Sequence, residues 1–298
     1  MKVCSVVVCY RPDIGALFEL CRILLRDGSG VILVDNTEMP YLDAHAVPEG
    51  CELITLAFNS GIAHAQNMGI ESALRAGSAV IAFFDQDSTI RPGVLSTLVA
   101  ALDPVAPEVV SPLYYDADSD AELPSLRLNR CGLVRAIHRD ESAPAYPVDV
   151  VISSGTVATK RVFEIAGKLD ERLFIDYVDT EWCLRCRSKN VPIRVVPAAS
   201  MRHRIGSKSI DLGFATVMVH SPVRCYYQIR NCLHLFRMRH VPRLFALRET
   251  LATCFSRALL LLFVSDRRRY GLAYWYALRD GFKGVTGGAP RTTASLIQ

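Results

Sequence analysis

The first hundred residues alternate between short apolar runs and amphipathic stretches. Four apolar runs predict strands, over residues 3–9, 31–34, 51–56 and 78–84, and the branched apolar residues of the first predict burial on both faces. The fourth is also predicted to be buried. Between them, apolar residues recur every three or four positions, which predicts helices over residues 14–25, 61–75 and 94–102. Strands that alternate with helices favour right-handed crossovers. The pattern therefore predicts an α/β fold with a mostly parallel central sheet and flanking helices.

The pattern is weaker from residue 109 onward. Residues 115–145 lack periodicity and are interpreted as a long surface excursion. After them we expect strands over residues 148–152 and 192–196, and helices over residues 161–166 and 181–189. Past residue 210 the chain is expected to be helical. We therefore predict one domain over residues 1–215 and a C-terminal helical segment over residues 216–298.

Charge is divided unevenly between these two parts. Residues 216–298 contain thirteen Lys and Arg against three Asp and Glu, whereas residues 1–215 contain twenty-one against twenty-seven. The basic segment also carries an apolar stripe at helical spacing, bordered by arginines: Leu247, Leu251, Phe255, Ala258, Leu259, Leu262 and Phe263, with Arg248, Arg257 and Arg267 to Arg269. Such a stripe is typical of a helix that lies on an anionic membrane surface. A helix that packs on the body or in a homo-oligomer has the same pattern, so both interpretations stay open.

Composition excludes several classes of protein. Because 50% of the 298 residues are hydrophobic and 21% are charged, a disordered chain is excluded. The longest clean apolar run in the C-terminal part, residues 258–264, is far shorter than the ~20 residues that cross a bilayer. Residues 3–10 lead into Arg11-Pro12 without a small-residue cleavage site, so no signal peptide is predicted. The ten cysteines lie mostly in apolar stretches, as free thiols do, and a reduced cytoplasmic compartment follows.

Polar residues follow the predicted strands where those strands end. They are Tyr10, Asp35, Asn59, Asp85, Gln86, Asp87, Ser154, Gly155 and His203. In an open parallel sheet, ligands bind beyond the carboxyl ends of the strands. We therefore expect these residues to converge on one edge of the sheet.

Two acidic patches are candidates for chemistry. Asp85 and Asp87 follow a buried strand, and two carboxylates so close repel each other unless a cation such as Mg²⁺ or Mn²⁺ lies between them. Asp also caps turns, so the motif alone does not decide for a metal. Asp176, Asp179 and Glu181 lie within six positions, and Asp179 could cap the following helix or act as a general base.

Other motifs lack the context that their chemistry needs. Gly28-x-Gly30 precedes a strand, which is the wrong side for a dinucleotide fingerprint, and Gly167-Lys168 lacks the upstream glycine of a P-loop. Cys183-x-x-Cys186 has no second ligand pair, which favours packing over zinc. The basic residues belong to no nucleic-acid binding module, so no nucleic-acid partner is expected.

Together these blocks resemble glycosyltransferase family 2, whose members are inverting enzymes with the GT-A fold. The matching residues are Val7 to Tyr10, Val34 to Asn36, Asn59 to Ala63, Gln66 to Gly69, Asp85 to Asp87, Ser153 to Gly155, Asp176 to Arg185 and His203 to Gly206. Their order and spacing hold over about residues 1–210. The segments around Asp85 and Asp179 are most similar to bacterial rhamnosyltransferases, and Arg224, Tyr226, Tyr227, Arg230 and Asn231 extend the match.

The resemblance implies a nucleotide-sugar half over residues 1–110 and an acceptor half over residues 111–215. On the donor side, it implies that Asp35 meets the pyrimidine base, that Tyr10, Asn59, Asp85 and Gln86 line the donor site, and that Asp87 and His203 hold the metal. On the acceptor side, it implies roles for Ser154, Gly155, Asp176 and Glu181. Asp179 aligns with the catalytic base, with Asp176 as the fallback because Val178 stands where many members have Glu. Arg204, Arg224 and Arg230 are expected to contact the diphosphate or a lipid phosphate.

The implied function is transfer of rhamnose from dTDP-L-rhamnose to a lipid or lipid-linked saccharide at the inner face of the cell membrane, in O-antigen, other polysaccharide or rhamnolipid synthesis. One alternative is a family 2 transferase that uses another UDP- or dTDP-sugar, because Asp35 cannot separate uracil from thymine. Another is a catalytically silent GT-A scaffold at the membrane.

Overall fold

The computed structural model describes residues 1–138, 143–203, 209–211 and 216–297, with side chains of residues 209–211 and 216 left undescribed. Its centre is an eight-stranded sheet in the order β3-β2-β1-β4-β9-β5-β10-β8. The strands are β1 Val3–Cys9, β2 Ser29–Asp35, β3 Cys51–Thr55, β4 Val80–Asp85, β5 Val109–Asp116, β8 Tyr146–Val148, β9 Val157–Thr159 and β10 Ile193–His203. Four of the seven pairings are parallel, and β9 runs antiparallel between β4 and β5. The predicted α/β fold with a mostly parallel sheet is confirmed.

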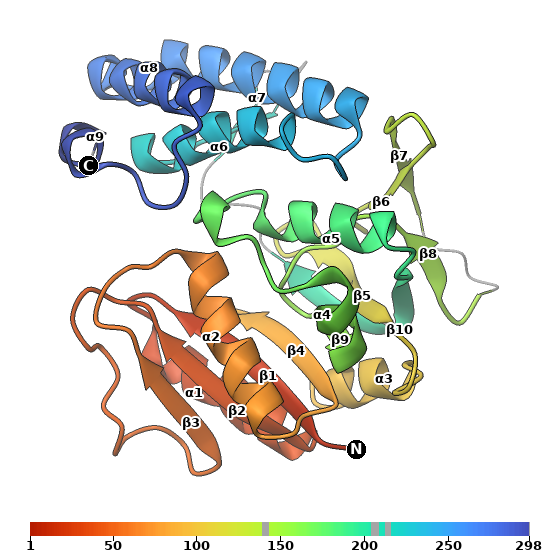
Figure 1. Cartoon of the computed structure of the whole chain (residues 1–298). Coiled ribbons are helices and arrows are strands. Elements are labelled where there is room, and N and C mark those ends of the chain that lie inside the picture. Colours follow the sequence, from red (N-terminus) through yellow and green to blue (C-terminus); the bar gives the residue numbers. More distant parts are fainter. Residues whose placement is uncertain (139–142, 204–208, 212–215, 298) are drawn as a thin grey trace.

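Helices cover both faces of this sheet, which explains why the inner strands β1 and β4 are almost entirely apolar (Figure 1). One face packs against α1 Ile14–Arg26 and α3 Val94–Ala100, and the other against α2 Ile62–Arg75, α4 Lys160–Ala166 and α5 Val178–Ser188. Neighbouring residues of β1 point to opposite faces, so Val6 enters one core and Val7 the other. Both side chains are fully buried.

The second half of the chain differs from the sequence prediction in several elements. Residues 109–116 form the central strand β5, and the expected excursion contains a hairpin of β6 Ser125–Leu128 and β7 Val134–Ile137. The expected strand over 148–152 is displaced, because β8 ends at Val148. Strand β10 continues to His203, seven residues beyond the predicted end, and passes an irregularity between Val196 and Ser200. Short antiparallel strands carry too little periodicity to be found from the sequence.

The C-terminal helices form a separate layer, drawn in blue in Figure 1. They follow a small ribbon of β11 Ser209–Asp211 and β12 Thr216–Met218, and a short 3₁₀ turn, η1 Glu171–Leu173, lies beneath them. The helices are α6 Pro222–Leu235, α7 Arg243–Phe263, α8 Arg267–Lys283 and α9 Arg291–Ile297. Helix α6 lies innermost, with Tyr226 and Arg230 fully buried. None of the helices in the described ranges is long and apolar enough to cross a membrane. The boundary at residue 215 stays a prediction.

Candidate active site

The ends of β1 and β4 are joined by a pair of hydrogen bonds. The backbone N–H of Tyr10 donates to Gln86 Oε1 over 2.6 Å, and Gln86 Nε2 donates to the Tyr10 carbonyl over 3.2 Å. The Tyr10 hydroxyl donates to Glu38 over 2.8 Å, the Arg11 guanidinium lies 5.3 Å from the centre of its ring, and the residue is 38% exposed. Tyr10 and Gln86 therefore lie together on the edge of the sheet.

Asp35 does not have the open position that contact with a base requires. Its carboxylate is fully buried and accepts three backbone N–H groups, from Thr37 over 3.1 Å, Tyr41 over 2.7 Å and Leu42 over 3.1 Å. The expected contact with a pyrimidine stays a prediction, and in this conformation the carboxylate is occupied by the backbone. Asp35 instead orders the loop after β2, because a carboxylate that accepts several amides fixes the path of the backbone that surrounds it.

Asn59 connects that loop to the start of α2. Its Oδ1 accepts from Asn36 Nδ2 over 3.3 Å and from the Gly61 N–H over 3.1 Å, while Asn36 Oδ1 accepts from both the N–H and the hydroxyl of Ser60. Asn59 itself is exposed. It lies on the same edge as Tyr10 and has donor atoms that a ligand can reach.

Asp85 occupies the centre of the acidic cluster at the end of β4. Its pKa is raised to about 6, mainly by burial and then by the negative charges of Asp87 and Asp179, while the positive charge of Arg224 acts in the opposite direction. These three carboxylates therefore share one electrostatic environment, although Asp179 comes from a different element. Like charges held this close favour a bound cation.

Ser154 and Gly155 pack beneath this acidic cluster and are buried. The Ser154 hydroxyl, 2% exposed, lies 2.6 Å from that of Ser88 and 3.4 Å from the Asp85 N–H. Gly155 has φ +84°, and an added Cβ would lie 2.5 Å from Met201 Sδ. The acceptor-side roles predicted for both residues stay predictions, and in this conformation Gly155 packs against β5 and β10.

Asp87 and His203 come together although 116 positions separate them. An antiparallel bridge between Thr89 and Arg202 places the end of β10 beside the loop after β4. Burial lowers the pKa of His203, and the negative charge of Asp87 acts in the opposite direction. Neutral imidazole and carboxylate are both metal ligands, and His suits Mn²⁺ better than Mg²⁺.

Asp87 and His203 fit a metal ion whose other ligands are water and substrate oxygens. Within the described part of the chain, no three His, Cys, Asp or Glu side chains form a cluster that could enclose a metal. Mg²⁺ in phosphate sites is commonly held by one or two carboxylates, with water and substrate phosphates completing the shell. Asp87, which is exposed, could provide such a ligand. Arg204 lies outside the described residues.

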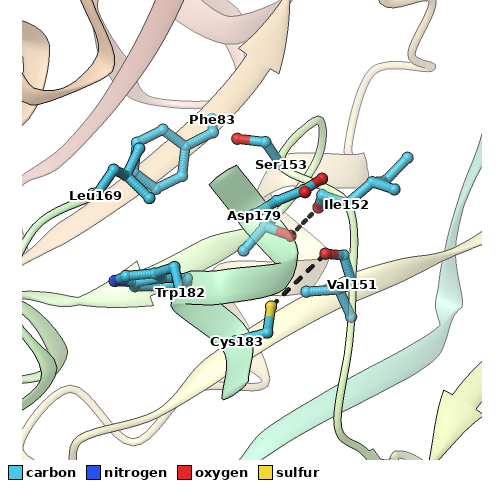
Figure 2. A pocket seen from close by; sticks show the side chains of 9 residues that line it. Phe83, Val151, Ile152, Ser153, Leu169, Asp179, Trp182 and Cys183 are labelled. Carbon is cyan, nitrogen blue, oxygen red and sulfur yellow. Dashed lines mark hydrogen bonds between the residues drawn. The ribbon is translucent and has the colours of Figure 1, made fainter. Parts of the chain in front are cut away.

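Asp179 lines a small pocket at the start of α5, shown in Figure 2. The pocket also contains Ser153, Thr156, Phe83 and Trp182. Burial raises the pKa of Asp179, an effect that the Thr180 N–H opposes by donating to Oδ1 over 2.7 Å. A carboxylate with a raised pKa in a closed pocket is a stronger base than an exposed one.

Ser153 and Gln66 belong to the matching sequence blocks, but no role in the site was predicted for them. Gln66 Nε2 donates to the Ser153 hydroxyl over 2.7 Å, and Gln66 is only 4% exposed. The signal was available in the sequence, since a polar residue on the buried face of a helix needs a buried partner. What the sequence could not show is that the partner is Ser153 and not Ser154.

The backbone before α5 is strained and is held in place from outside. Phe174, Asp176 and Tyr177 all have φ between 62° and 67°, a region that costs non-glycine residues energy. The Phe174 carbonyl accepts from the Ile62 N–H over 2.8 Å, and a Cβ on Gly61 would lie 2.6 Å from that carbonyl oxygen. Only glycine allows this approach of α2 to the loop.

Helix α6 holds the other side of the same loop. Asn231 Nδ2 donates to the carbonyls of Leu173, Ile175 and Asp176 over 2.7–3.1 Å. Arg230 is fully buried and donates to the carbonyls of Leu173 and Gly287. The predicted contact of Arg230 with a diphosphate or lipid stays a prediction, and in this conformation main-chain carbonyls engage its guanidinium.

Asp176 and Glu181 have firm partners. Arg224 Nε donates to both Asp176 oxygens, over 3.2 and 3.3 Å. Glu181 is 1% exposed and pairs with Arg185 and His240, both over 2.7 Å. Glu181 is therefore enclosed between α5 and the chain before α7 in this conformation, and its acceptor-side role stays a prediction. Arg224, whose side chain is 47% exposed, keeps the access that its predicted role needs.

A curated relative covers almost the whole chain. The dTDP-rhamnosyl transferase RfbF of Shigella flexneri is 39% identical over 285 residues, which are 95% of this chain and 96% of the relative. The expected resemblance to bacterial rhamnosyltransferases is thereby confirmed.

Solved structures share the fold at low sequence identity. The structure of S. aureus TarS residues 1–349 in complex with UDP-GlcNAc has a TM-score of 0.59 and 16% identity, and the match covers 100% of this chain and 84% of that one. The structure of GalNAc-T7 with UDP, GalNAc and Mn²⁺ has a TM-score of 0.54 and 12% identity, over 68% of this chain and 44% of that one. The model of the family described as glycosyl transferase family 2 matches residues 23–164. With the relative that spans nearly the full length, this places the chain in glycosyl transferase family 2.

Proposed function

We propose that this transferase moves a rhamnosyl group from dTDP-L-rhamnose to an acceptor hydroxyl with inversion, and that Asp179 is the base. The observation that carries the proposal is the position of Asp179. It lies in a buried pocket within the electrostatic reach of Asp85, its pKa is raised, and no arginine or lysine among the described residues forms an ion pair with it. A carboxylate in this state accepts a proton from an attacking hydroxyl and returns to a neutral form that its site favours.

Asp176 is the weaker candidate for the base. Arg224 donates to both of its oxygens, which stabilises the ionised form and reduces its tendency to take a proton. Arg224 also lowers the pKa of Asp85, so it lies between the two acidic groups. We infer that Arg224 offsets negative charge at the junction of donor and acceptor.

Asp87 and His203 would hold Mg²⁺ or Mn²⁺ against the diphosphate of the donor. The ion would supply positive charge that stabilises the leaving nucleoside diphosphate. The chain's own contribution is the edge formed by Tyr10, Asn59 and Gln86, which presents an aromatic face and amide groups to a nucleotide. GalNAc-T7 is described with UDP and Mn²⁺ on a similar fold, which supports this proposal without extending to its sugar.

The base assignment is tested by Asp179→Asn beside Asp176→Asn. Loss of general-base catalysis costs typically ~10²–10⁴-fold in rate, so we expect kcat of Asp179→Asn to fall by that amount while dTDP still raises its Tm. Asp176→Asn should lose less, because its partner Arg224 remains. If Asp179→Asn kept near wild-type turnover and Asp176→Asn did not, the base would be Asp176.

The donor is tested by a thermal-shift screen of nucleotide sugars with and without divalent metal. Selective stabilisation by dTDP-L-rhamnose supports the proposal, and equal or stronger stabilisation by another UDP- or dTDP-sugar favours that donor. A donor-hydrolysis assay separates both from the silent scaffold, which should release no nucleoside diphosphate with or without Mg²⁺.

We further propose that α7 lies on an anionic membrane surface at the cytoplasmic face, where a lipid or lipid-linked saccharide acceptor is found. Leu247, Leu251, Phe255 and Leu262 recur along one side of α7 and are 44–62% exposed, so the body does not cover this stripe. Trp275 and Phe282 on the neighbouring α8 are also exposed, at 66% and 70%. Arg267 to Arg269 lie at the junction of α7 and α8, where they could meet lipid phosphates.

Flotation with vesicles containing anionic lipid tests this surface. The wild type should bind at low salt and be released at high salt, because the arginine contribution is screened. The double change Leu251→Asp with Phe255→Asp should abolish binding, whereas Val105→Asp, at a residue 66% exposed on the body, should not. Binding that ignores salt and lipid charge, or a stable dimer that the double change dissociates, would instead show that α7 is a protein interface.

A further inference from the structure

A second pocket lies between α5, α6 and α7, on the other side of Asp176 from the acidic cluster. Its volume is about 330 Å³, within the range of small-molecule sites. Most of its lining is polar: Asp176, Tyr177, Thr180, Gln228, Ala252, Thr253, Ser256 and Arg257. It shares no lining residue with the pocket around Asp179, although Thr180 is the next residue in the chain.

Arg257 is a buried cation on the wall of this pocket. It is 6% exposed, and its Nε has no hydrogen-bond partner. Its Nη atoms donate only to neutral groups, Cys225 Sγ over 3.5 Å and the Ser256 hydroxyl over 3.0 Å. Across the residues that the structure describes, no carboxylate lies within 4.0 Å of it. A buried guanidinium without a counter-charge costs several kcal/mol, so its presence needs a reason.

The surroundings do not supply the missing negative charge. Asp176, the carboxylate on the pocket wall, is engaged by Arg224. The pKa of His220 is lowered to about 4 by burial and then by the positive charges of Arg224 and Arg257. The pocket therefore holds an uncompensated positive potential, with hydroxyl and amide groups around it.

We propose that this pocket binds a phosphate group of the acceptor, with Arg257 as its principal ligand. The planar guanidinium donates through parallel N–H groups, which matches a phosphate, and among the described residues its Nε has no partner that would compete. Thr180, Thr253, Ser256 and Gln228 can donate to the remaining oxygens or to sugar hydroxyls. Because Asp176 and Thr180 flank Asp179, an acceptor anchored here would carry its hydroxyl towards the base. The identity of the ligand as the acceptor rests on the proposed function, whereas the phosphate site does not.

Phosphate binding is measured on the full chain with the donor site filled. The Tm is followed against inorganic phosphate, glucose 1-phosphate and glucose at constant ionic strength, with Mg²⁺ and saturating dTDP present so that the diphosphate position is occupied. The wild type should be stabilised by both phosphates and not by glucose. Tighter binding of glucose 1-phosphate indicates a sugar-linked phosphate, as the acceptor requires. Equal binding of both would overturn the acceptor as the source, and no phosphate-dependent shift would overturn the site.

Arg257→Met and Arg22→Met form the matched pair of variants. Arg22 lies on α1 with its side chain 52% exposed, and its loss should leave phosphate binding unchanged. Arg257→Met should bind phosphate at least about tenfold more weakly, since a charge-assisted hydrogen bond is lost. Without phosphate, the Tm of Arg257→Met should equal or exceed that of the wild type, because a buried charge without a partner is removed. A lower Tm together with unchanged phosphate affinity would show that Arg257 is structural.

Arg257→Lys tests whether a loss of phosphate binding in Arg257→Met is caused by misfolding. It keeps the charge but lacks the planar fork, so it should retain part of the phosphate response. In the same variants, stabilisation by dTDP-L-rhamnose should stay at the wild-type level. If the Tm of the wild type did not respond to dTDP-L-rhamnose, the proposed donor would be wrong. The comparison of Arg257→Met with Arg22→Met in phosphate would still show whether the pocket binds phosphate.

Discussion

Replacing Asn231 by Ala should both destabilise the fold and slow the reaction. The Nδ2 group has two hydrogens and serves three carbonyls of the strained loop before α5, and Oδ1 accepts from Arg230 Nε over 3.0 Å. The change therefore removes two donors and one acceptor in a fully buried site. At about 1 kcal/mol for each hydrogen bond, the free energy of unfolding should fall by about 3 kcal/mol.

That loss should lower the Tm by roughly 6–12 °C, at roughly 2–4 °C for each kcal/mol in a domain of 150–250 residues. Because the loop leads directly to Asp179, relaxation of its positive φ angles should also displace the base, so kcat should fall with little change in the KM for the donor. Asn190→Ala is the control. Asn190 is exposed and also has positive φ, at 58°, so it should cost only about 1–2 kcal/mol and leave kcat unchanged. A Tm for Asn231→Ala equal to or above that of Asn190→Ala would refute the reasoning.

Three further changes test other parts of the structure. Gly155→Ala should lower the Tm by at least as much as Asn231→Ala, as measured by calorimetry, because its Cβ meets Met201 and its φ is +84°. Burial raises the pKa of Glu181, but hydrogen bonds from His240 and Arg185 outweigh that effect and leave the pKa lowered. Ionised Glu181 therefore stabilises the folded state. This stabilisation is complete above the unfolded pKa of Glu181 and is lost as pH falls through its folded pKa. Glu181→Gln should therefore have a lower free energy of unfolding than the wild type near neutral pH, and this difference should shrink as pH falls through the folded pKa of Glu181, so the acid limb of the variant should be flatter. Since the pKa of Asp179 is raised, kcat should rise with pH across a range above that of an ordinary Asp, and Asp179→Asn should remove that rise. A pH profile that is the same in Asp179→Asn and the wild type would count against this base.

The sequence by itself determined the elements with a long or strong period. The buried strands β1 to β4 and the helices α1 and α2 are where the pattern predicted them, because a continuous apolar run or a 3.6-residue repeat reports local burial directly. The same rule predicted that Tyr10, Asn59, Asp85 and Asp87 share one edge of the sheet. The C-terminal helices were also predicted, from the apolar stripe and the basic composition.

Only the tertiary structure decided which of these polar residues are open to a ligand. Asp35, Ser154 and Arg230 have the residue types that a binding site needs. In the structure, however, each forms its hydrogen bonds with buried backbone or with neighbouring side chains. A sequence shows that a side chain can donate or accept, but its partner depends on segments far away in the chain. The same reason applies to Arg257, which the sequence placed at the border of the apolar stripe. In the structure Arg257 is buried beside a polar pocket, because α7 packs on α6 and Arg257 contacts Cys225 there. No local sequence pattern encodes that contact.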